Sequence, residues 1–339
     1  INTKQGKTGK ATISIKSLMG FNSQAHKDIL RPINAAQYTE LYLEGYINRG
    51  DTPAQAQARF DQIFRQLIDP STGKPTDTNW YDAIERTGIT QSYDLSVRGG
   101  TEKVKYFMSG SFLDQENYII GSGFKRISGR TNFEYKATDY LTISNNITVS
   151  DFVSNTFFDS GSWSNPFKST LELSPLIPIY DDQGRYNSEH DNYFPMGGSN
   201  ALGSLTGDDL WETKQLRIID NFAVSVNLLK NLKFRSQWNF DILSIGESQY
   251  LNPRYGGGKD NGGYGYEANT SNKTLVGTQT LDYNFVLGEY HNFNVLAGYE
   301  AQETTFESNS ASGTQFPNDK VRTLNSASAE FAISGSKSE

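Results

Sequence analysis

Apolar and polar residues alternate in ten segments of the chain. In the stretch SYDLSVRGGTEKVKYFMSGSFLDQE, which spans residues 92–116, two alternating runs meet at Gly99 and Gly100. Side chains of a β-strand point to opposite faces in turn, so the stretch predicts two strands with one apolar and one polar face each. The same pattern predicts strands over residues 11–21, 93–98, 104–115, 124–135, 141–152, 216–228, 232–242, 275–287, 293–302 and 326–334.

The two faces can be assigned in two hairpins. The apolar face of the first is expected to carry Tyr93, Leu95, Val97, Val104, Tyr106, Met108 and Phe112, and its polar face Asp94, Ser96, Arg98, Lys105 and Ser109. In the hairpin over 222–242, the apolar set is Phe222, Val224, Val226, Leu228, Leu232, Phe234, Trp238, Phe240 and Ile242. The opposite face there carries Lys233, Arg235, Gln237, Asn239 and Asp241. One face suits lipid and the other a wet lumen.

Short and long connections alternate between the predicted strands. The short ones read GGTEK, KATDY, LKN and GEYHN, whereas residues 22–92, 153–215, 243–274 and 303–325 form long connections and 116–123 is short. Short turns at one rim and long loops at the other are typical of an outer-membrane β-barrel. A soluble sandwich has the same alternation but does not normally carry loops this long. The pattern therefore favours an all-β, antiparallel transmembrane barrel, with a soluble sandwich as the alternative.

The first long connection also contains helical patterns. Thr52 and Pro53 supply a cap and a first helical residue, and they precede apolar residues at helical spacing, Phe60, Ile63, Phe64 and Leu67. A second helix is expected from Asn34 through Tyr38, Leu41 and Tyr42. We expect both apolar stripes to pack locally rather than to form a groove for a partner.

Composition excludes several classes of protein. Hydrophobic residues make up 36% of the 339 residues and the mean hydropathy is −0.58, and no apolar run is long enough for a transmembrane helix. The chain has no Cys, and its three histidines, at positions 26, 190 and 291, are not spaced as metal ligands. The net charge of −7 argues against a nucleic-acid surface. No catalytic constellation, phosphate loop or cofactor motif is present, so we expect neither an enzyme nor a cofactor.

Several motifs resemble those of a known family. The opening INTKQGKTGKATISIK, residues 1–16, resembles the plug-to-barrel junction of SusC/RagA-type TonB-dependent outer-membrane transporters of Bacteroidetes. NAAQYTELYLE, TNWYDAIERTG, LSVRGGTEKVKYFMSGSFLDQENYI and FKRISGRTNFEY follow in the family's order. The resemblance covers residues 1 to about 149 as ordered motifs and continues as strand rhythm to the end. Because the chain begins with Ile1 and carries no secretory signal, we expect an internal piece of a longer protein.

The resemblance implies a fold and a function. Residues 1–10 would end the plug domain, and residues 11–339 would supply about ten strands of a 22-stranded barrel with long extracellular loops that carry short helices. The whole protein would import oligosaccharides or peptides across the outer membrane with a SusD-like surface lipoprotein. TonB would energise it through an N-terminal region that this chain lacks. A surface adhesin or glycan-binding β-domain without transport is the alternative, and a barrel hydrolase is a third possibility.

Aromatic residues of the outer loops are the candidate ligand-binding residues, because aromatic faces stack on sugar rings and peptide groups. They are Phe157, Phe158, Trp163, Tyr180, Tyr186, Tyr193, Phe194, Trp211, Tyr255, Tyr264 and Tyr266. The alternative for each is packing within the loops or contact with the lipoprotein. Asp181, Asp182 and Asn187 could in principle bind calcium, but their spacing is not that of an EF-hand loop and we expect a solvated turn without metal.

Overall fold

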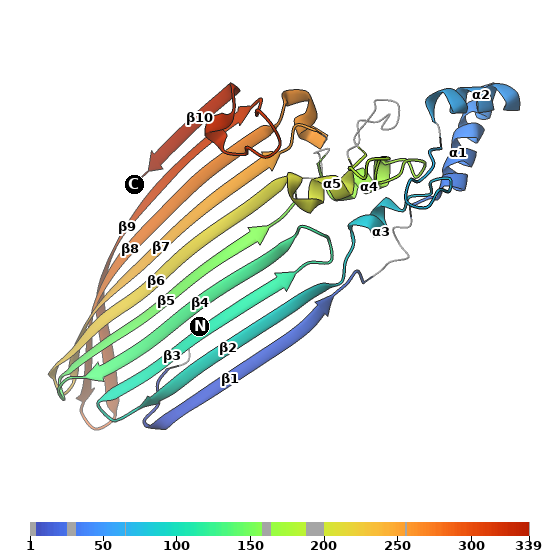
Figure 1. Cartoon of the computed structure of the whole chain (residues 1–339). Helices are drawn as coiled ribbons and strands as arrows, with labels where there is room; N and C mark the ends of the chain where they lie inside the picture. Colours follow the sequence, from blue (N-terminus) through green and yellow to red (C-terminus); the bar gives the residue numbers. More distant parts are fainter. Residues whose placement is uncertain are drawn as a thin grey trace.

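The chain folds into a single antiparallel sheet with helices at one end. A computed structural model describes residues 5–25, 32–64, 66–157, 164–187, 200–254 and 256–338. Each strand pairs with the next one along the chain (Figure 1). The strands are β1 Gly9–Asn22, β2 Gly88–Gly100, β3 Val104–Glu116, β4 Gly123–Lys136, β5 Leu141–Asn155, β6 Leu210–Leu229, β7 Leu232–Leu251, β8 Tyr264–Leu287, β9 His291–Thr314 and β10 Ala329–Ser338. The predicted all-β, antiparallel fold is confirmed.

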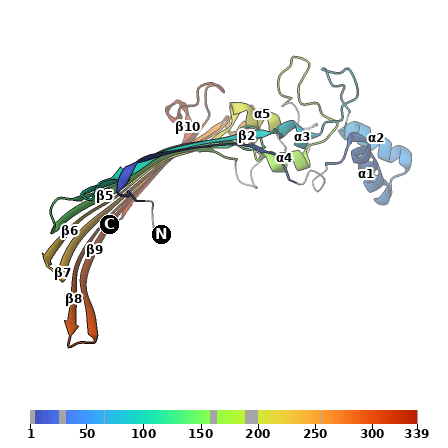
Figure 2. The ribbon, with the colours of Figure 1, turned by 90° about the horizontal axis from the view of Figure 1, so that it is seen from below.

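The sheet is strongly curved and is not closed. Figure 2 shows it bending from β1 towards β8 and β9, so that one of its faces is concave. In the part of the chain that the structure describes, β1 pairs only with β2 and β10 only with β9. A curved sheet with two unpaired edge strands has the geometry of one part of a barrel wall.

The strands are longer than their alternating segments, and four of them reach 20 residues or more. β8 and β9 each contain 24 residues and β6 and β7 each contain 20. The loops expected over 243–274 and 303–325 are therefore too long in the prediction, because the structure has connections only between Leu251 and Tyr264 and between Thr314 and Ala329. Polar residues occupy both faces in these extensions, which hides the alternation while the backbone ladder continues.

Strand register confirms the assigned faces. Tyr93 lies opposite Phe112, and Val97 lies opposite Met108, so these side chains share a face of the sheet. The second hairpin follows the same rule, since Phe222 lies opposite Trp238. The apolar face is open to its surroundings in the described part of the chain: Leu95 is 55% exposed and Ile127 is 61% exposed. A broad exposed apolar face requires an apolar environment or a covering partner.

One polar pair interrupts the apolar face. Asp220 lies opposite Phe240 on β7, and Asn145 of β5 lies opposite Phe222, so both polar side chains project from the apolar side. The Nδ2 atom of Asn145 donates a hydrogen bond of 2.5 Å to Oδ1 of Asp220. This bond partly satisfies both groups and limits the cost of placing them in an apolar surface.

Within the described residues, five α-helices lie at one end of the sheet, in the long connections (Figure 1). They are α1 Ala35–Asn48, α2 Pro53–Ile63, α3 Trp80–Ile84, α4 Pro166–Glu172 and α5 Ala201–Gly203. Both predicted helices are present, but α2 ends at Ile63, so Phe64 and Leu67 of the predicted apolar stripe lie beyond it. Each helix begins with a capping box, formed by Asn34 with Gln37 and by Thr52 with Gln55. Within the described ranges, no helix has the length and apolar character that a membrane span requires.

The long connections pack on one another in two apolar clusters. One cluster contains Trp80, Ile84, Ile119, Leu173, Ile177 and Ala201, which come from three different connections. The other joins Phe60 of α2 and its C-cap residue Phe64 to Ala35 and Leu176. Backbone and side-chain hydrogen bonds link the same segments: the Trp80 indole donates to the Ser174 carbonyl at 3.0 Å. The connections therefore form a structured cap at this end of the sheet.

Candidate functional site

The polar face of the sheet carries ion pairs and hydroxyl groups. Lys105 lies opposite Glu134 and contacts it at 2.8 Å. The guanidinium of Arg217 donates two hydrogen bonds to the Asp241 carboxylate, of 3.0 and 2.6 Å. Ser111 and Ser128 are joined at 2.6 Å across β3 and β4. These groups suit a surface that contacts water and polar solutes, because side chains that already pair can still exchange hydrogen bonds with a solute.

Three predicted ligand-binding aromatics come together on this polar face, near the helical end of the sheet. Trp211 of β6 lies opposite Gln249 of β7, which in turn lies opposite Tyr266 of β8. Tyr264 is two residues away on the same side of β8. Neighbouring strands are about 4.8 Å apart, so the Trp211 and Tyr266 backbones are about 10 Å apart, with an amide side chain between them. In such a row, the aromatic side chains can stack on a polar ring while the amide side chain between them forms hydrogen bonds with it.

The other predicted aromatics that are described lie in the loops and contact each other. Tyr180 and Tyr186 stack with ring centroids 5.3 Å apart, and Phe157 meets Phe167 edge-on at 5.8 Å. Their role in ligand binding stays a prediction. The five remaining candidates, Phe158, Trp163, Tyr193, Phe194 and Tyr255, lie outside the described residues.

The acidic turn has internal partners. The Asp181 carboxylate accepts hydrogen bonds from the backbone of Gln183 and Arg185 and forms an ion pair of 2.8 Å with the Arg185 side chain. Asn187 is buried and donates to the Pro178 carbonyl at 3.3 Å. In the described part of the chain, no three His, Cys, Asp or Glu side chains gather as a metal site.

A buried carboxylate that the sequence did not indicate lies where β6 begins. The backbone and side-chain amides of Asn252 donate to Oδ1 of Asp209 at 2.9 and 2.7 Å. Burial raises the pKa of Asp209 to about 6, against the opposing effect of these hydrogen bonds and of those from the Ser164 and Ser204 side chains. Nothing in the polar segment around residue 209 distinguishes this carboxylate from a solvated one, because its burial depends on segments far away in the chain.

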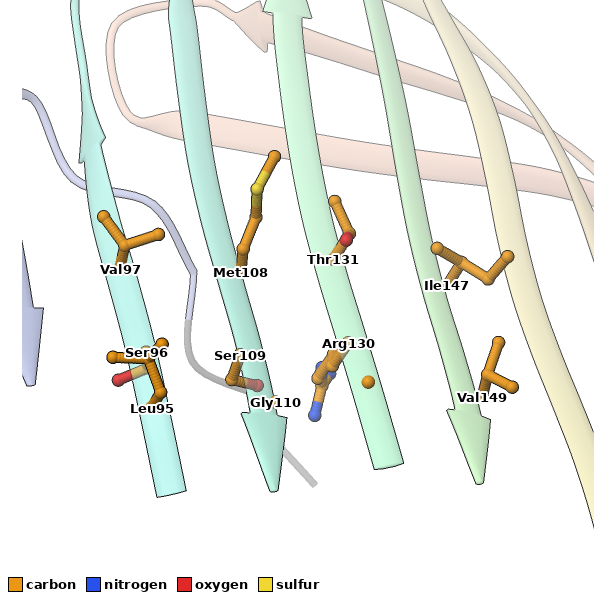
Figure 3. A pocket seen from close by; sticks show the side chains of 11 residues that line it. Leu95, Ser96, Val97, Met108, Ser109, Gly110, Arg130, Thr131, Ile147 and Val149 are labelled. Carbon is orange, nitrogen blue, oxygen red and sulfur yellow. The ribbon is translucent and has the colours of Figure 1, made fainter. Parts of the chain in front are cut away.

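The apolar face contains a hollow of about 360 Å³ (Figure 3). Gly110 and Gly129 lie directly opposite each other at its floor, and Leu95, Val149 and Met108 stand around it. Other glycines of this face are covered by aromatic rings: Tyr106 covers Gly99 and Trp238 covers Gly277. Because the hollow is lined mostly by apolar side chains, it does not suit a hydrophilic ligand.

Known proteins resemble this chain over between about three fifths and nearly all of its length. It is 24% identical over 330 residues to the TonB-dependent receptor P39 of Formosa agariphila, a match that covers 96% of this chain and 29% of that protein. It is 23% identical over 210 residues to the TonB-dependent receptor SusC of Bacteroides thetaiotaomicron, with 61% of this chain and 18% of SusC covered. No protein-family model matches.

Solved structures agree with the sequence comparison. The structure of the RagAB peptide transporter superposes with a TM-score of 0.77 at 20% identity, over 98% of this chain and 40% of that one. RagAB in its 'closed-closed' state gives a TM-score of 0.73. The predicted resemblance to SusC/RagA-type TonB-dependent transporters is confirmed. The chain spans about 29% of the length of P39, and its relatives are named as receptors and importers rather than enzymes.

Proposed function

We propose that the chain forms part of the barrel wall and extracellular cap of a TonB-dependent active importer in the outer membrane. Residues 1–10 would end the plug domain and residues 11–339 would belong to the barrel. The observation that carries this proposal is the division of one curved, up-and-down sheet into an exposed apolar face and an ion-paired polar face. Lipid solvates the first and the water-filled lumen contacts the second.

The height of the apolar band supports a membrane position. On β7 the apolar side runs from Leu232 to Ile242, which is about 33 Å along the strand. At a tilt of about 40° this corresponds to a height of about 25 Å, the height of the apolar band of an outer-membrane barrel. Charged pairs resume on the same face beyond the band, where Lys125 contacts Asp114 at 3.1 Å and Lys214 contacts Glu212 at 2.7 Å.

The connections support an orientation. Tight turns such as that between Gly100 and Val104 lie at one end of the sheet, and the helical cap lies at the other (Figure 1). Barrels of this class place short turns in the periplasm and long loops outside the cell. The cap would then contact a SusD-like surface lipoprotein, and TonB would act through the plug. RagAB is named a peptide importer, and the polar face here suits oligosaccharides or peptides.

Gene deletion with an energy control tests the proposal. Cells that lack the full gene are compared with complemented cells for internalised, fluorescently labelled oligosaccharides and oligopeptides, and an impermeant quencher removes the signal of surface-bound ligand. We expect uptake of one ligand class to be lost on deletion, restored by the gene, and abolished by a protonophore. Ligand that binds the complemented cells but stays quenchable would instead support a surface adhesin. Unchanged uptake of both ligand classes would contradict the proposal.

A further inference from the structure

A groove runs along the apolar face of β2 to β5. The hollow of about 360 Å³ adjoins a second one of about 600 Å³. Both are lined by Leu95, Gly110, Gly129 and Val149. The first hollow extends to Met108 and the second to Ile127. Figure 3 shows Leu95 and Val149 on opposite sides of Gly110. The two hollows therefore form one groove, and the backbone of the two opposed glycines is its floor.

No contact within the described chain requires glycine at this floor. Neither Gly110 nor Gly129 has a positive φ. A Cβ atom on Gly129 would have no atom within 4 Å, and one on Gly110 would meet only the Ser128 carbonyl oxygen, at 4.0 Å. Glycine weakens a strand relative to alanine, and within a strand it often marks the close approach of a ligand. The bare floor therefore points to an occupant from outside the chain.

The groove lies in the outer half of the proposed membrane band. Met108, at one end of the groove, is close to the centre of a band about 25 Å high, since it lies four residues beyond Val104 at the tight turn. Phe112 and Ile127, at the other end, lie opposite each other and about 10 Å higher at a strand tilt of about 40°. The groove thus ends close to the lipid headgroups of the outer leaflet, where an acyl chain is the available apolar ligand.

The outer end of the groove carries charges of both signs. Asp151 lines the groove there and has no ion-pair partner among the described residues. Two residues further out, Lys125 contacts Asp114 at 3.1 Å. At the same level, Lys214 contacts Glu212 at 2.7 Å. A purely anionic headgroup would meet three carboxylates at this rim. A headgroup with one positive and one negative charge complements the rim better.

We propose that the groove binds one diacyl phospholipid of the outer leaflet, with an acyl chain on the glycine floor and a phosphoethanolamine headgroup at the charged rim. The ammonium group would contact the Asp151 carboxylate. The phosphate would lie between Lys125 and Lys214, which are two strands and therefore about 10 Å apart. The inference rests on the proposed membrane position. Without this lipid the bare floor brings no benefit, and alanine at position 129 would then stabilise the strand.

Lipid titration of the whole transporter tests the site. The full-length protein is purified in detergent, depleted of lipid and titrated with phosphatidylethanolamine or with phosphatidylglycerol of the same acyl chains, and native mass spectrometry counts the bound copies. We expect one saturable copy of phosphatidylethanolamine, with an affinity about tenfold above that for phosphatidylglycerol, because the ammonium group pairs with a carboxylate. A map of the protein with phosphatidylethanolamine should show an acyl chain over Gly110 and Gly129.

Matched variants identify the groove as the binding site. Gly129→Leu fills the floor and should remove the saturable copy, whereas Ala297→Leu adds the same side chain on the exposed apolar face, opposite Leu281 and outside the groove, and should not. Asp151→Asn should abolish the headgroup preference, and it decides the question if Gly129→Leu does not fold.

Three results would overturn the inference. They are equal binding of the two lipids by the wild type, equal binding by the wild type and the folded variants, and a map in which a protein segment fills the groove. The uptake experiment does not probe the groove. A transporter that imports its ligand but shows no groove-dependent lipid would therefore refute this inference alone.

Discussion

A lysine placed on either face of the β2–β3 hairpin should separate the lipid-facing from the luminal side. Met108 projects from the apolar face, where its direct partners are Val97 and Thr131. Ser96 projects from the other face, and its direct partners are Ser14 and Ser109, so a lysine there meets no charge directly across the strands. Met108→Lys and Ser96→Lys therefore introduce the same charge in one hairpin on opposite faces.

The depth of Met108 sets the expected magnitude. It lies four residues from Val104, the first residue after the turn, which is about 13 Å along the strand and about 10 Å in height at a tilt of about 40°. The centre of a band about 25 Å high is therefore close to this residue. Lysine there costs about 2–4 kcal/mol, against about 0–1 kcal/mol near an interface. Met108→Lys should thus reduce the folding equilibrium roughly 30- to 900-fold, and Val104→Lys much less.

Folding of the full-length transporter into lipid vesicles provides the measurement. Each variant is unfolded in urea, diluted into vesicles and scored by the change in gel mobility of the folded barrel on heating, and the abundance of each variant in isolated outer membranes is compared. We expect the costs to increase in the order Ser96→Lys, Val104→Lys, Met108→Lys. If Ser96→Lys were as costly as Met108→Lys, the assignment of the two faces, and with it the membrane position of the sheet, would be refuted.

Five further substitutions test packing in the sheet, in the cap and at one of the turns. Gly129→Ala should stabilise the protein by about 0.5–1 kcal/mol, because no atom lies within 4 Å of the added methyl group. Gly88→Ala should destabilise it by about 1–3 kcal/mol, because its methyl group would overlap the Glu116 carbonyl. Urea unfolding in vesicles compares the two variants. Trp80→Ala should cost about 3–5 kcal/mol within the cap and accelerate proteolysis there, while exposed Tyr140→Ala should not. Asn34→Ala should cost about 1 kcal/mol through loss of the α1 cap, seen as faster amide exchange in that helix.

Alternation in the sequence was sufficient to place the strands and their faces. Side chains on a strand have a period of two, so one correct assignment, such as that of Tyr93, fixes the face of every other residue on that strand. The helices were also legible, because Thr52 and Asn34 are local signals that need no tertiary contact. The full lengths of β8 and β9 could not be predicted from the sequence. The extensions of these strands carry polar residues on both faces and are held by backbone pairing rather than by burial.

Long-range packing was not accessible from the sequence. Trp80 reads as one aromatic residue in a polar segment, yet it is 1% exposed because residues about 90 positions further along the chain pack over it. The burial of Asp209 has the same origin, since Asn252, which holds it, comes from another connection. The periodic pattern of apolar residues predicts the faces of strands, and local capping residues predict the ends of helices. Contacts between long loops depend instead on how the whole sheet brings the ends of these loops together.

The candidate ligand-binding aromatics differ in how firmly they are positioned. Tyr266 pairs with strands on both sides, and Trp211 pairs with β7 while its carbonyl accepts a hydrogen bond of 3.0 Å from the Thr156 amide, so both backbones are fixed before a ligand arrives. Tyr180 and Tyr186 are held chiefly by each other and by one isolated bridge in a turn. Ordering a side chain on binding costs about 0.5–1.5 kcal/mol, and a site on strands avoids part of that cost. Among the described candidates, the row formed by Trp211, Gln249 and Tyr266 is therefore better organised for the predicted ligand binding than the pair of Tyr180 and Tyr186.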